Sequence, residues 1–211
     1  LKIAIDSPAA AGAGTLAKAI SKEYNLNYLD TGKIYRFIAF QKIKFPKKFN
    51  QKFLRSKINS LRVNDLKNKL LLSDEVGSEA AKISKLKYIR KMVYSFQKNF
   101  AYFPPKKFKG SCLDGRDITY KIVPDADFKF YITANIKIRA LRRYKELRKL
   151  GKKTTYNDVL KSIKNRDNSD FKRKNSPLKK TKDSLLINTT NLTKRSCFLK
   201  IKKIIDEKIN S

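Results

Sequence analysis

The first residues that could do chemistry lie close to the start of the chain, in a loop of small residues. Residues 3–5 are apolar and predict a short strand that ends at Asp6. Apolar residues return at helical spacing after Thr15, so the loop joins a strand to a helix. Gly12 and Gly14 let a backbone approach an anion closely, and a helix start offers unpaired N–H groups and a positive dipole end. The stretch is therefore a candidate phosphate-binding loop, with the Thr15 hydroxyl where a magnesium ligand would stand.

Two positions of this loop depart from the pattern Gly-x-x-x-x-Gly-Lys-Ser/Thr. Ser7 stands in place of the first glycine, and Ala13 stands in place of the lysine. The alternative interpretation is an ordinary tight turn between a strand and a helix of an α/β protein. The loop by itself is weak evidence for either.

Three further stretches carry side chains suited to an anion: residues 29–36, 113–117 and 164–173. The first two follow predicted strands, and ligands of open α/β sheets bind beyond the carboxyl ends of strands, so we expect both to converge on the first loop. The arginines concerned have planar guanidinium groups that suit phosphate oxygens. They are Arg36, Arg116, Arg166 and Arg173. Each alone could be a solvated surface charge, but together with the first loop they favour a phosphate site.

The chain is strongly basic, with 51 Lys+Arg against 18 Asp+Glu and a formal net charge of +33. A nucleic acid or an acidic membrane would be the functional reading of such a charge. However, lysine, isoleucine and asparagine are enriched together, and the lysines are scattered over every segment. We therefore favour a codon bias towards A and T, and expect no stable nucleic-acid or membrane partner.

Several classes of function are excluded by residue types. The chain has no histidine and only two cysteines, Cys112 and Cys197, which excludes a Ser-His or Cys-His mechanism, an ordinary zinc site and a disulfide framework. No apolar run approaches the length of a membrane span, and no signal peptide is recognisable. We expect a cytoplasmic protein.

Strands alternate with helices along the chain, which predicts an α/β fold with a parallel sheet and no second domain with its own core. The predicted strands cover residues 3–5, 25–30, 111–114, 127–133 and 184–188. The predicted helices begin near Thr15 and Gly32 and cover residues 78–100, 138–148, 156–166 and 198–209. Residues 41–74 are expected to form a small mobile insertion, and residues 167–182 a flexible polar segment.

The helix over 138–148 is long and basic. Its apolar positions Ile138, Leu141, Tyr144 and Leu147 are expected to point inward. Its arginines Arg139, Arg142, Arg143 and Arg148 are expected to surround that face.

Taken together, these motifs resemble the bacterial cytidylate kinases, a family of nucleoside-monophosphate kinases. The resemblance covers nearly the whole chain and rests on Leu29-Asp-Thr-Gly-x-Ile-Tyr-Arg36, on Asp114-Gly-Arg-Asp117 and on the spacing of Arg166, Asp170 and Arg173. It implies a P-loop NTPase-type core of about five parallel strands, an insertion and a basic lid. The implied division is a core of residues 1–40, 101–140 and 183–211, an insertion over about 41–100 and a lid over about 141–182. It also implies in-line transfer of the ATP γ-phosphate to CMP or dCMP with Mg²⁺, by a protein that we expect to be a monomer.

The resemblance assigns roles to individual residues. ATP binding falls to Ser7, Pro8, Ala9, Ala10, Ala11, Gly12, Ala13, Gly14 and Thr15, and Mg²⁺ to Thr15 and Asp114. The acceptor phosphate falls to Thr31, Arg36 and Arg116, the cytosine edge to Arg90 and Asp117, and the sugar to Arg166 and Asp170. The transferring phosphate falls to Arg173 with Arg139, Arg142 or Arg143.

The chain departs from the family pattern at several places. Ala13 removes the loop lysine, Ala81 stands where the family commonly has a serine near the base, and Ile118-Thr119 follow Asp117 without the second glycine turn. The insertion also looks shorter than is usual. These departures leave two alternatives open, a nucleotide-binding pseudokinase and, less favoured, a basic nucleic-acid-binding protein.

One departure suggests its own compensation. The family normally has lysine at the position of Ala13 and a small residue at that of Lys33, so the two are exchanged here. Lys33 opens a helix at the end of the second strand, and its flexible stem can deliver a point charge. We expect Lys33 to act as a relocated catalytic cation; the alternative is that it is one more product of the lysine bias.

Overall fold

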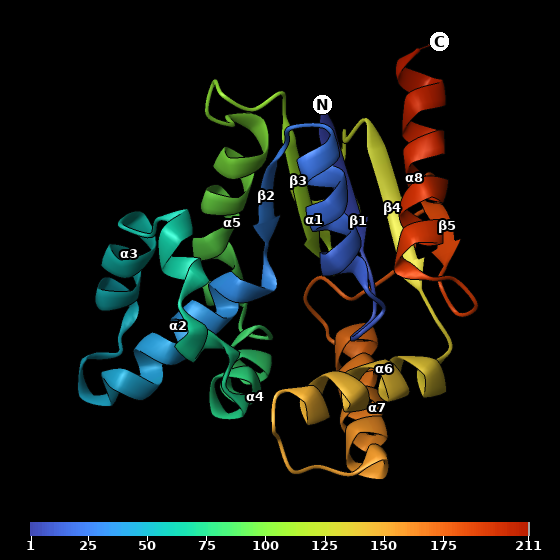
Figure 1. The fold of residues 1–211 in the computed structure, drawn as a ribbon. Helices are drawn as coiled ribbons and strands as arrows, with labels where there is room; N and C mark the ends of the chain where they lie inside the picture. Colours follow the sequence, from blue (N-terminus) through green and yellow to red (C-terminus); the bar gives the residue numbers. More distant parts are fainter. Residues whose placement is uncertain (211) are drawn as a thin grey trace.

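A five-stranded parallel sheet forms the centre of the molecule (Figure 1). The computed structural model describes residues 1–210, and its strands are ordered β2-β3-β1-β4-β5. They span β1 Lys2–Asp6, β2 Asn27–Asp30, β3 Ser111–Gly115, β4 Phe128–Thr133 and β5 Leu185–Asn188. All four neighbouring pairs are parallel, because each strand returns through a helical crossover. The α/β fold and parallel sheet are as predicted.

The two faces of the sheet are covered by different helices. Ile3, Ile5 and Phe130 pack with α1 (Ala13–Glu23) and α8 (Lys194–Ile209). Ala4 and Leu113 point the other way, into a core shared with α2 (Gly32–Lys44) and α5 (Lys87–Tyr102). This alternation is the period of two that a strand imposes on its side chains. Because the strands are buried on both faces, only the edge at their carboxyl ends is left for polar side chains.

Residues 46–83 form a helical insertion beside α2. It comprises 3₁₀ turns η1 Pro46–Lys48, η2 Val63–Lys67 and η3 Lys69–Leu72, with helices α3 Gln51–Asn59 and α4 Asp74–Ile83. Leu54 and Leu71 of this segment are fully buried, so the segment is packed tightly against α2. The prediction of one helix over 78–100 was wrong. The chain leaves the helix at Ser84–Leu86, where the Ser84 carbonyl accepts a hydrogen bond from Arg90 at 3.1 Å, and resumes it in α5.

Two helices, α6 (Ile136–Lys149) and α7 (Tyr156–Lys172), lie beyond the carboxyl ends of the strands and cross one another in the view of Figure 1. The prediction that residues from 167 onward are flexible was wrong for the first six of them, since α7 continues to Lys172. Its last turns are held because Asp167 and Asp170 are buried against arginines of other elements.

The inward face of α6 also differs from the prediction. Arg139 is only 6% exposed, whereas Leu141, expected inside, is 39% exposed. The reason is that α6 packs on a polar partner, the phosphate-binding loop and Asp167, at the position where an apolar side chain was expected. The buried arginine is stabilised there because its Nε and Nη1 groups donate to backbone carbonyls and its charge is paired with Asp167.

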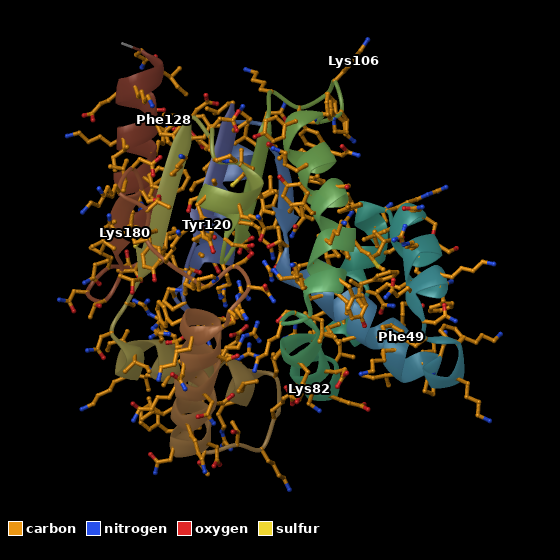
Figure 2. The ribbon with its side chains drawn as sticks, turned by 180° about the vertical axis from the view of Figure 1, so that it is seen from behind. Phe49, Lys82, Lys106, Tyr120, Phe128 and Lys180 are labelled. Atoms are coloured by element: carbon orange, nitrogen blue, oxygen red, sulfur yellow. The ribbon has the colours of Figure 1, made fainter. Side chains whose placement is uncertain are left out.

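The surface charge is spread widely over the molecule. Lys82, Lys106 and Lys180 project from well-separated parts of it (Figure 2). Nothing in this distribution singles out one basic face. No helix within residues 1–210 is both long and apolar enough to cross a membrane.

Candidate active site

The phosphate-binding loop has the backbone shape of an anion cradle. Gly12, with φ of 90°, caps the start of α1, and Ala10 also adopts a left-handed conformation with φ of 59°. Within residues 1–210, the amides of Gly12 through Thr15 donate to no other group. Four unpaired N–H groups at a helix N-terminus favour a bound anion such as phosphate. The geometry therefore supports the interpretation as a phosphate loop over that of an ordinary turn, despite Ser7 and Ala13.

Asp6, which the sequence analysis treated only as a strand end, supports the neighbouring loop. It is fully buried and accepts hydrogen bonds from the amides of Ile118 and Thr119 at 2.8 and 2.9 Å and from the Thr119 hydroxyl at 2.6 Å. Burial raises the pKa of Asp6 to about 6, against the effect of these bonds. The chain there forms a π-type turn, η4 (Ile118–Ile122). Where the family pattern has a second glycine turn after Asp117, this chain has Thr119, whose amide and hydroxyl both donate to Asp6.

Asp114 lies at the end of β3, directly under the start of α1. Its carboxylate accepts a bond from the Tyr28 hydroxyl at 2.7 Å, and a Cβ on Gly14 would lie 3.5 Å from both groups. Burial, and next the charge of Asp30, raise the pKa of Asp114 to about 7. The side chain of Lys18, on α1, opposes this shift and was missed by the sequence analysis. The sequence feature that could have identified Lys18 is its position four residues after Gly14, which places both residues on the same face of α1.

These groups were tested for their fit to a magnesium ion. Within residues 1–210, no cluster of three or more Asp, Glu, Cys or His side chains could hold a metal. The charge of Asp30 nevertheless raises the pKa of Asp114, and a carboxylate so affected favours a cation beside it. Asp114 and the hydroxyl of Thr15 are oxygen donors of the kind that Mg²⁺ prefers when phosphates and waters supply its other ligands. The residues fit an ion that is brought in with a phosphate ligand.

On the acceptor side, Arg90 and Asp117 form a buried ion pair across the sheet edge. Arg90 reaches it from α5, and its guanidinium lies over the Tyr35 ring at 5.5 Å from the ring centre. The side chains of Arg90 and Asp117 are only 11% and 7% exposed. A guanidinium fork beside a carboxylate offers both donors and an acceptor to one polar ligand edge. The two residues are brought together as predicted.

Asp170 is the common ion-pair partner of three of the predicted arginines. Arg116 lies 2.8 Å from it, Arg166 3.2 Å and Arg173 3.6 Å. Burial would raise the pKa of Asp170, but the charges of Arg116 and Arg166 outweigh it, and the net shift is downward. Asp170 is thus ionised and holds the arginines in place.

Arg173 lies with the acceptor-side residues. Its side chain is 5% exposed, lies 3.9 Å from Asp117, and its Nη2 atom is buried without a hydrogen-bond partner within residues 1–210. Burial, and then the charge of Arg90, lower its pKa. An unpaired buried guanidinium nitrogen costs free energy unless a ligand supplies the acceptor.

Arg36 lies within range of two other arginines, Arg166 and Arg143. Arg36 donates from Nη1 to the carbonyls of Leu71 and Ser73 at 2.8 and 3.3 Å. Its pKa is lowered by burial and by the charges of Arg166 and Arg143. Like charges held close together favour a bound anion, here on the acceptor side of the phosphate loop.

The Thr31 hydroxyl, expected to approach the acceptor phosphate, is already engaged in a hydrogen bond. Its hydroxyl donates to the Asp114 carbonyl at 2.8 Å, and a Cβ on Gly115 would lie 2.4 Å from it. Arg143 pairs with Glu146 at 2.9 Å near the surface of α6. Arg142, an alternative to Arg143 in the prediction, donates instead to the carbonyl of Thr189 at 2.6 Å.

Lys33 is the second residue of α2 and is half-buried. It forms no ion pair or hydrogen bond with the residues in the range 1–210. Its proposed relocation to the phosphate loop therefore stays a prediction.

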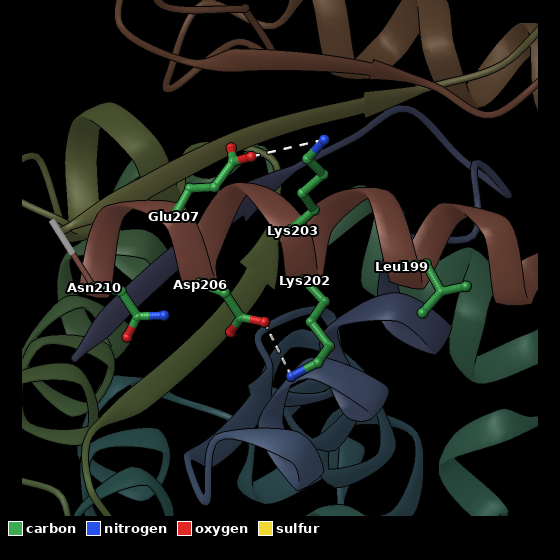
Figure 3. A pocket seen from close by; sticks show the side chains of 6 residues that line it. All are labelled: Leu199, Lys202, Lys203, Asp206, Glu207 and Asn210. Atoms are coloured by element: carbon green, nitrogen blue, oxygen red, sulfur yellow. Dashed lines mark ion pairs between the residues drawn. The ribbon is translucent and has the colours of Figure 1, made fainter.

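A shallow hollow of about 530 Å³ lies elsewhere, along the outer side of α8 (Figure 3). Its walls are side chains of that one helix, including the ion pairs Lys202–Asp206 and Lys203–Glu207. Because these cations already have carboxylate partners, the hollow offers no anion site. The convergent residues at the carboxyl edge of the sheet remain the candidate active site.

Comparison with known proteins gives a consistent result. The family model "Cytidylate kinase" matches residues 3–207. The cytidylate kinase of Bartonella henselae is 42% identical, over 97% of this chain and 94% of that protein. Those of Mesomycoplasma hyopneumoniae and Clostridium botulinum are 36% and 35% identical, over 99% and 97% of this chain and 95% and 97% of theirs.

A solved structure shares the fold at much lower identity. An uncharacterized protein from Eubacterium ventriosum aligns over 97% of both chains with a TM-score of 0.56 and 15% identity. The family match across almost the whole sequence confirms the resemblance on which the sequence analysis relied. The chain belongs to the cytidylate kinase family.

Proposed function

We propose that this protein is a cytidylate kinase that transfers the γ-phosphate of ATP to CMP or dCMP, giving CDP or dCDP. The observation that carries the proposal is the complete acceptor side, with Arg90 paired to Asp117 and three arginines gathered on Asp170, in a chain of this family. Buried charges of this kind are costly, and a bound nucleotide would supply partners for them.

The donor nucleotide is assigned to residues 7–15. The amides of Gly12 through Thr15 would hold its phosphates, because they have no acceptor within residues 1–210 and lie at the positive end of α1. Thr15 and Asp114 would hold Mg²⁺ brought by ATP, which would neutralise phosphate charge there. The buried Asp6 keeps the next loop in place beside them.

The acceptor is assigned to the opposite side of the cleft. Arg90 and Asp117 would bind the cytosine edge, with Arg173 beside them supplying its unpaired Nη2. Arg166 and Asp170 would hold the sugar, as the family resemblance implies. The acceptor phosphate is assigned to Thr31, Arg36 and Arg116, and the transferring phosphate to Arg143 and Lys33.

No general base is required, because the attacking oxygen belongs to a phosphate that is already ionised. Positioning and neutralisation of charge would supply most of the rate enhancement. In this scheme the arginines stabilise charge that spreads over the transferring group. The family resemblance also assigns Arg139 to the transferring phosphate; its Nε and Nη1 donate to the carbonyls of Ala134 and Ala9, which supports a role in positioning the loop.

The test is a coupled assay with ATP, Mg²⁺ and CMP, dCMP, UMP, AMP or GMP. We expect CMP and dCMP to be the best acceptors and UMP a poorer one, because a site built to hydrogen-bond one edge leaves buried groups unpaired with the wrong base. AMP phosphorylated as fast as CMP would overturn the assignment of the base site. Tight CMP binding without any transfer would identify a pseudokinase, which nothing in the comparisons favours.

The remaining assignments are also proposals. Residues 41–100 and 141–182 are proposed as the insertion and the lid on a core of the other residues. A monomer in the cytoplasm, with no nucleic-acid partner, is the organisation that we propose.

A further inference from the structure

Ala9 of the phosphate loop is held at both of its backbone polar groups by side chains of α6 and α7. Its amide donates to Asp167 Oδ1 at 3.0 Å, and its carbonyl accepts from Arg139 Nη1 at 2.8 Å. The same Arg139 nitrogen lies 2.7 Å from Asp167 Oδ2, which closes a three-membered arrangement of two side chains and one residue of the loop. Arg139 comes from α6 and Asp167 from α7, so both lid helices take part.

The arrangement is buried and complete. The side chains of Arg139 and Asp167 are 7% and 9% exposed, and the remaining Arg139 Nε donates to the Ala134 carbonyl at 2.9 Å. Ala9 also packs against the small apolar core that α6 and α7 share around Ala140 and Ile163. Charge-assisted bonds in such surroundings are stronger than exposed ones, and removal of one partner leaves the other unpaired.

The next residue of the loop explains what this tether does. Ala10 has φ of 59°, a left-handed conformation that is strained for a residue with a side chain. It persists only where the flanking residues are fixed. Ala9 is fixed on one side. On the other, the Ala11 carbonyl accepts from the Thr189 hydroxyl at 3.3 Å, and Thr189 is itself bonded by Arg142 at 3.0 Å.

We propose that Arg139 and Asp167 are a positioning pair that presets the shape of the phosphate loop before ATP arrives. The inference rests on the proposed function, in which this loop binds the triphosphate. It gives Arg139 a role different from that of a cation at the transferring phosphate. Because Ala13 stands where the phosphate-loop pattern has a lysine, the backbone amides must supply most of the attraction for phosphate. A cradle that is already formed binds an anion without first bearing the cost of ordering.

The experiment compares Asp167→Ala, Asp167→Asn and Arg139→Lys with the parent, and uses Asp158→Asn as a matched control. Asp158 is an exposed carboxylate on the same helix whose bonds are to Thr155 at the start of α7. Thermal unfolding confirms that each variant is folded. Amide hydrogen exchange of residues 9–15 without nucleotide is measured first, and then the KM for ATP and for CMP.

We expect Asp167→Ala, which removes the acceptor of the Ala9 amide, to accelerate exchange of that amide at least about tenfold and to raise the KM for ATP by about tenfold, with the KM for CMP within about twofold. Asp167→Asn keeps an acceptor for the Ala9 amide and should show a smaller change in the same direction. Arg139→Lys should also fall between the parent and Asp167→Ala, since an ammonium cannot reproduce the forked contacts. The control should match the parent in both measurements.

Each other result counts against part of the inference. Unchanged exchange in Asp167→Ala would overturn the tether itself, whatever the enzyme does. Accelerated exchange with an unchanged KM for ATP and a raised KM for CMP would overturn the assignment of the loop to ATP, while leaving the tether in place. An equal rise in both KM values would show a structural role only and would overturn the role in positioning.

Discussion

The two sides of the candidate site, which we propose for the donor and for the acceptor, would hold their phosphates by different means. On the acceptor side, Asp117 and Asp170 are surrounded by arginines from β3, α5 and α7. On the donor side, the phosphate loop from Ser7 to Thr15 contains no cation at all, and its amides face the site unpaired. One side depends on the placement of charged side chains, and the other on the shape of the backbone.

Because of this difference, we expect the two sides to lose function on different substitutions. A network of buried charges fails when one member is removed, because a partner is left unpaired. A backbone cradle has no side chain to lose, and it fails only when the groups that hold its shape are removed.

The largest effect is expected from Asp117→Asn. It leaves Arg90 buried without its charge partner and removes an acceptor from the base site, so kcat/KM for CMP should fall by roughly a thousandfold or more. The KM for ATP should change little. Glu79→Gln, which removes the partner of Lys42 on the insertion, is the matched control and should retain most activity. Steady-state kinetics with both substrates measures this. A fall in ATP affinity as large as that in CMP affinity would break the separation of the two sides.

The next largest effect is expected from Lys33→Ala. A unit charge about 4 Å from a phosphate is worth roughly 4 kcal/mol at an effective dielectric of about 20 before desolvation. A loss of kcat of about a hundredfold is therefore expected, and Ala13→Lys added to Lys33→Ala should restore much of it. Lys22→Ala, on the exposed side of α1, is the control.

Lys18 is a second candidate for the cation that replaces the missing loop lysine. It lies on α1 one turn beyond Gly14, and its charge acts on Asp114. If Lys18→Ala loses activity and Lys33→Ala keeps it, the relocated cation is Lys18. Full activity in both single variants and in the double variant would mean that the donor side works on backbone amides alone.

A smaller effect concerns stability and pH. The pKa of Asp114 is raised to about 7 and that of Asp6 to about 6, mainly by burial, above the value of about 3.9 expected in the unfolded chain. The folded state therefore binds more protons at these two groups, so their contribution to stability is fully present below about pH 4 and is lost as the pH rises through 6 to 7.

Asp114→Asn cannot ionise and should remove much of this decline. At pH 8 its free energy of unfolding without nucleotide should exceed that of the parent by on the order of a few kcal/mol, while activity with Mg²⁺ and ATP falls. Urea unfolding at several pH values measures both curves. Parallel curves for parent and variant would show that Asp114 titrates normally.

The smallest effect is expected from Ala10→Gly. Glycine adopts a φ of 59° without strain but loses more freedom on folding, so a net gain in the free energy of unfolding of about 0.5–1 kcal/mol is expected. Chemical denaturation measures it. A loss of stability would show that the Ala10 conformation is not strained.

Much of the acceptor side could be predicted from sequence. Arg36, Arg116 and Asp117 lie at or near strand ends, and the carboxyl ends of parallel strands meet at one edge, so their convergence follows from chain order. Asp167 and Arg139 could not be assigned in this way. Their partner is the backbone of Ala9, more than 100 residues away, and a backbone group carries no residue type to recognise.

Local pattern also failed where tertiary contacts outweigh propensity. The apolar spacing through residues 78–100 suits one helix, but Arg90 takes the Ser84 carbonyl and the chain breaks there. The polar composition after Asp167 suits a flexible segment, yet α7 continues because buried Asp170 has arginine partners. Periodicity records which side chains are apolar, and cannot show which polar ones find partners inside.

The sequence by itself determined the alternation of strands and helices, the strand-end motifs and hence the family, because these depend on short-range spacing and residue type. Only the tertiary structure decided that Arg173 lies with Asp117 on the acceptor side, that Arg139 faces the loop while Leu141 faces outward, and that Asp6 supports the turn at Thr119. These are contacts between elements distant in the chain. Their geometry is set by how the helices pack on the sheet, and a linear pattern does not contain it.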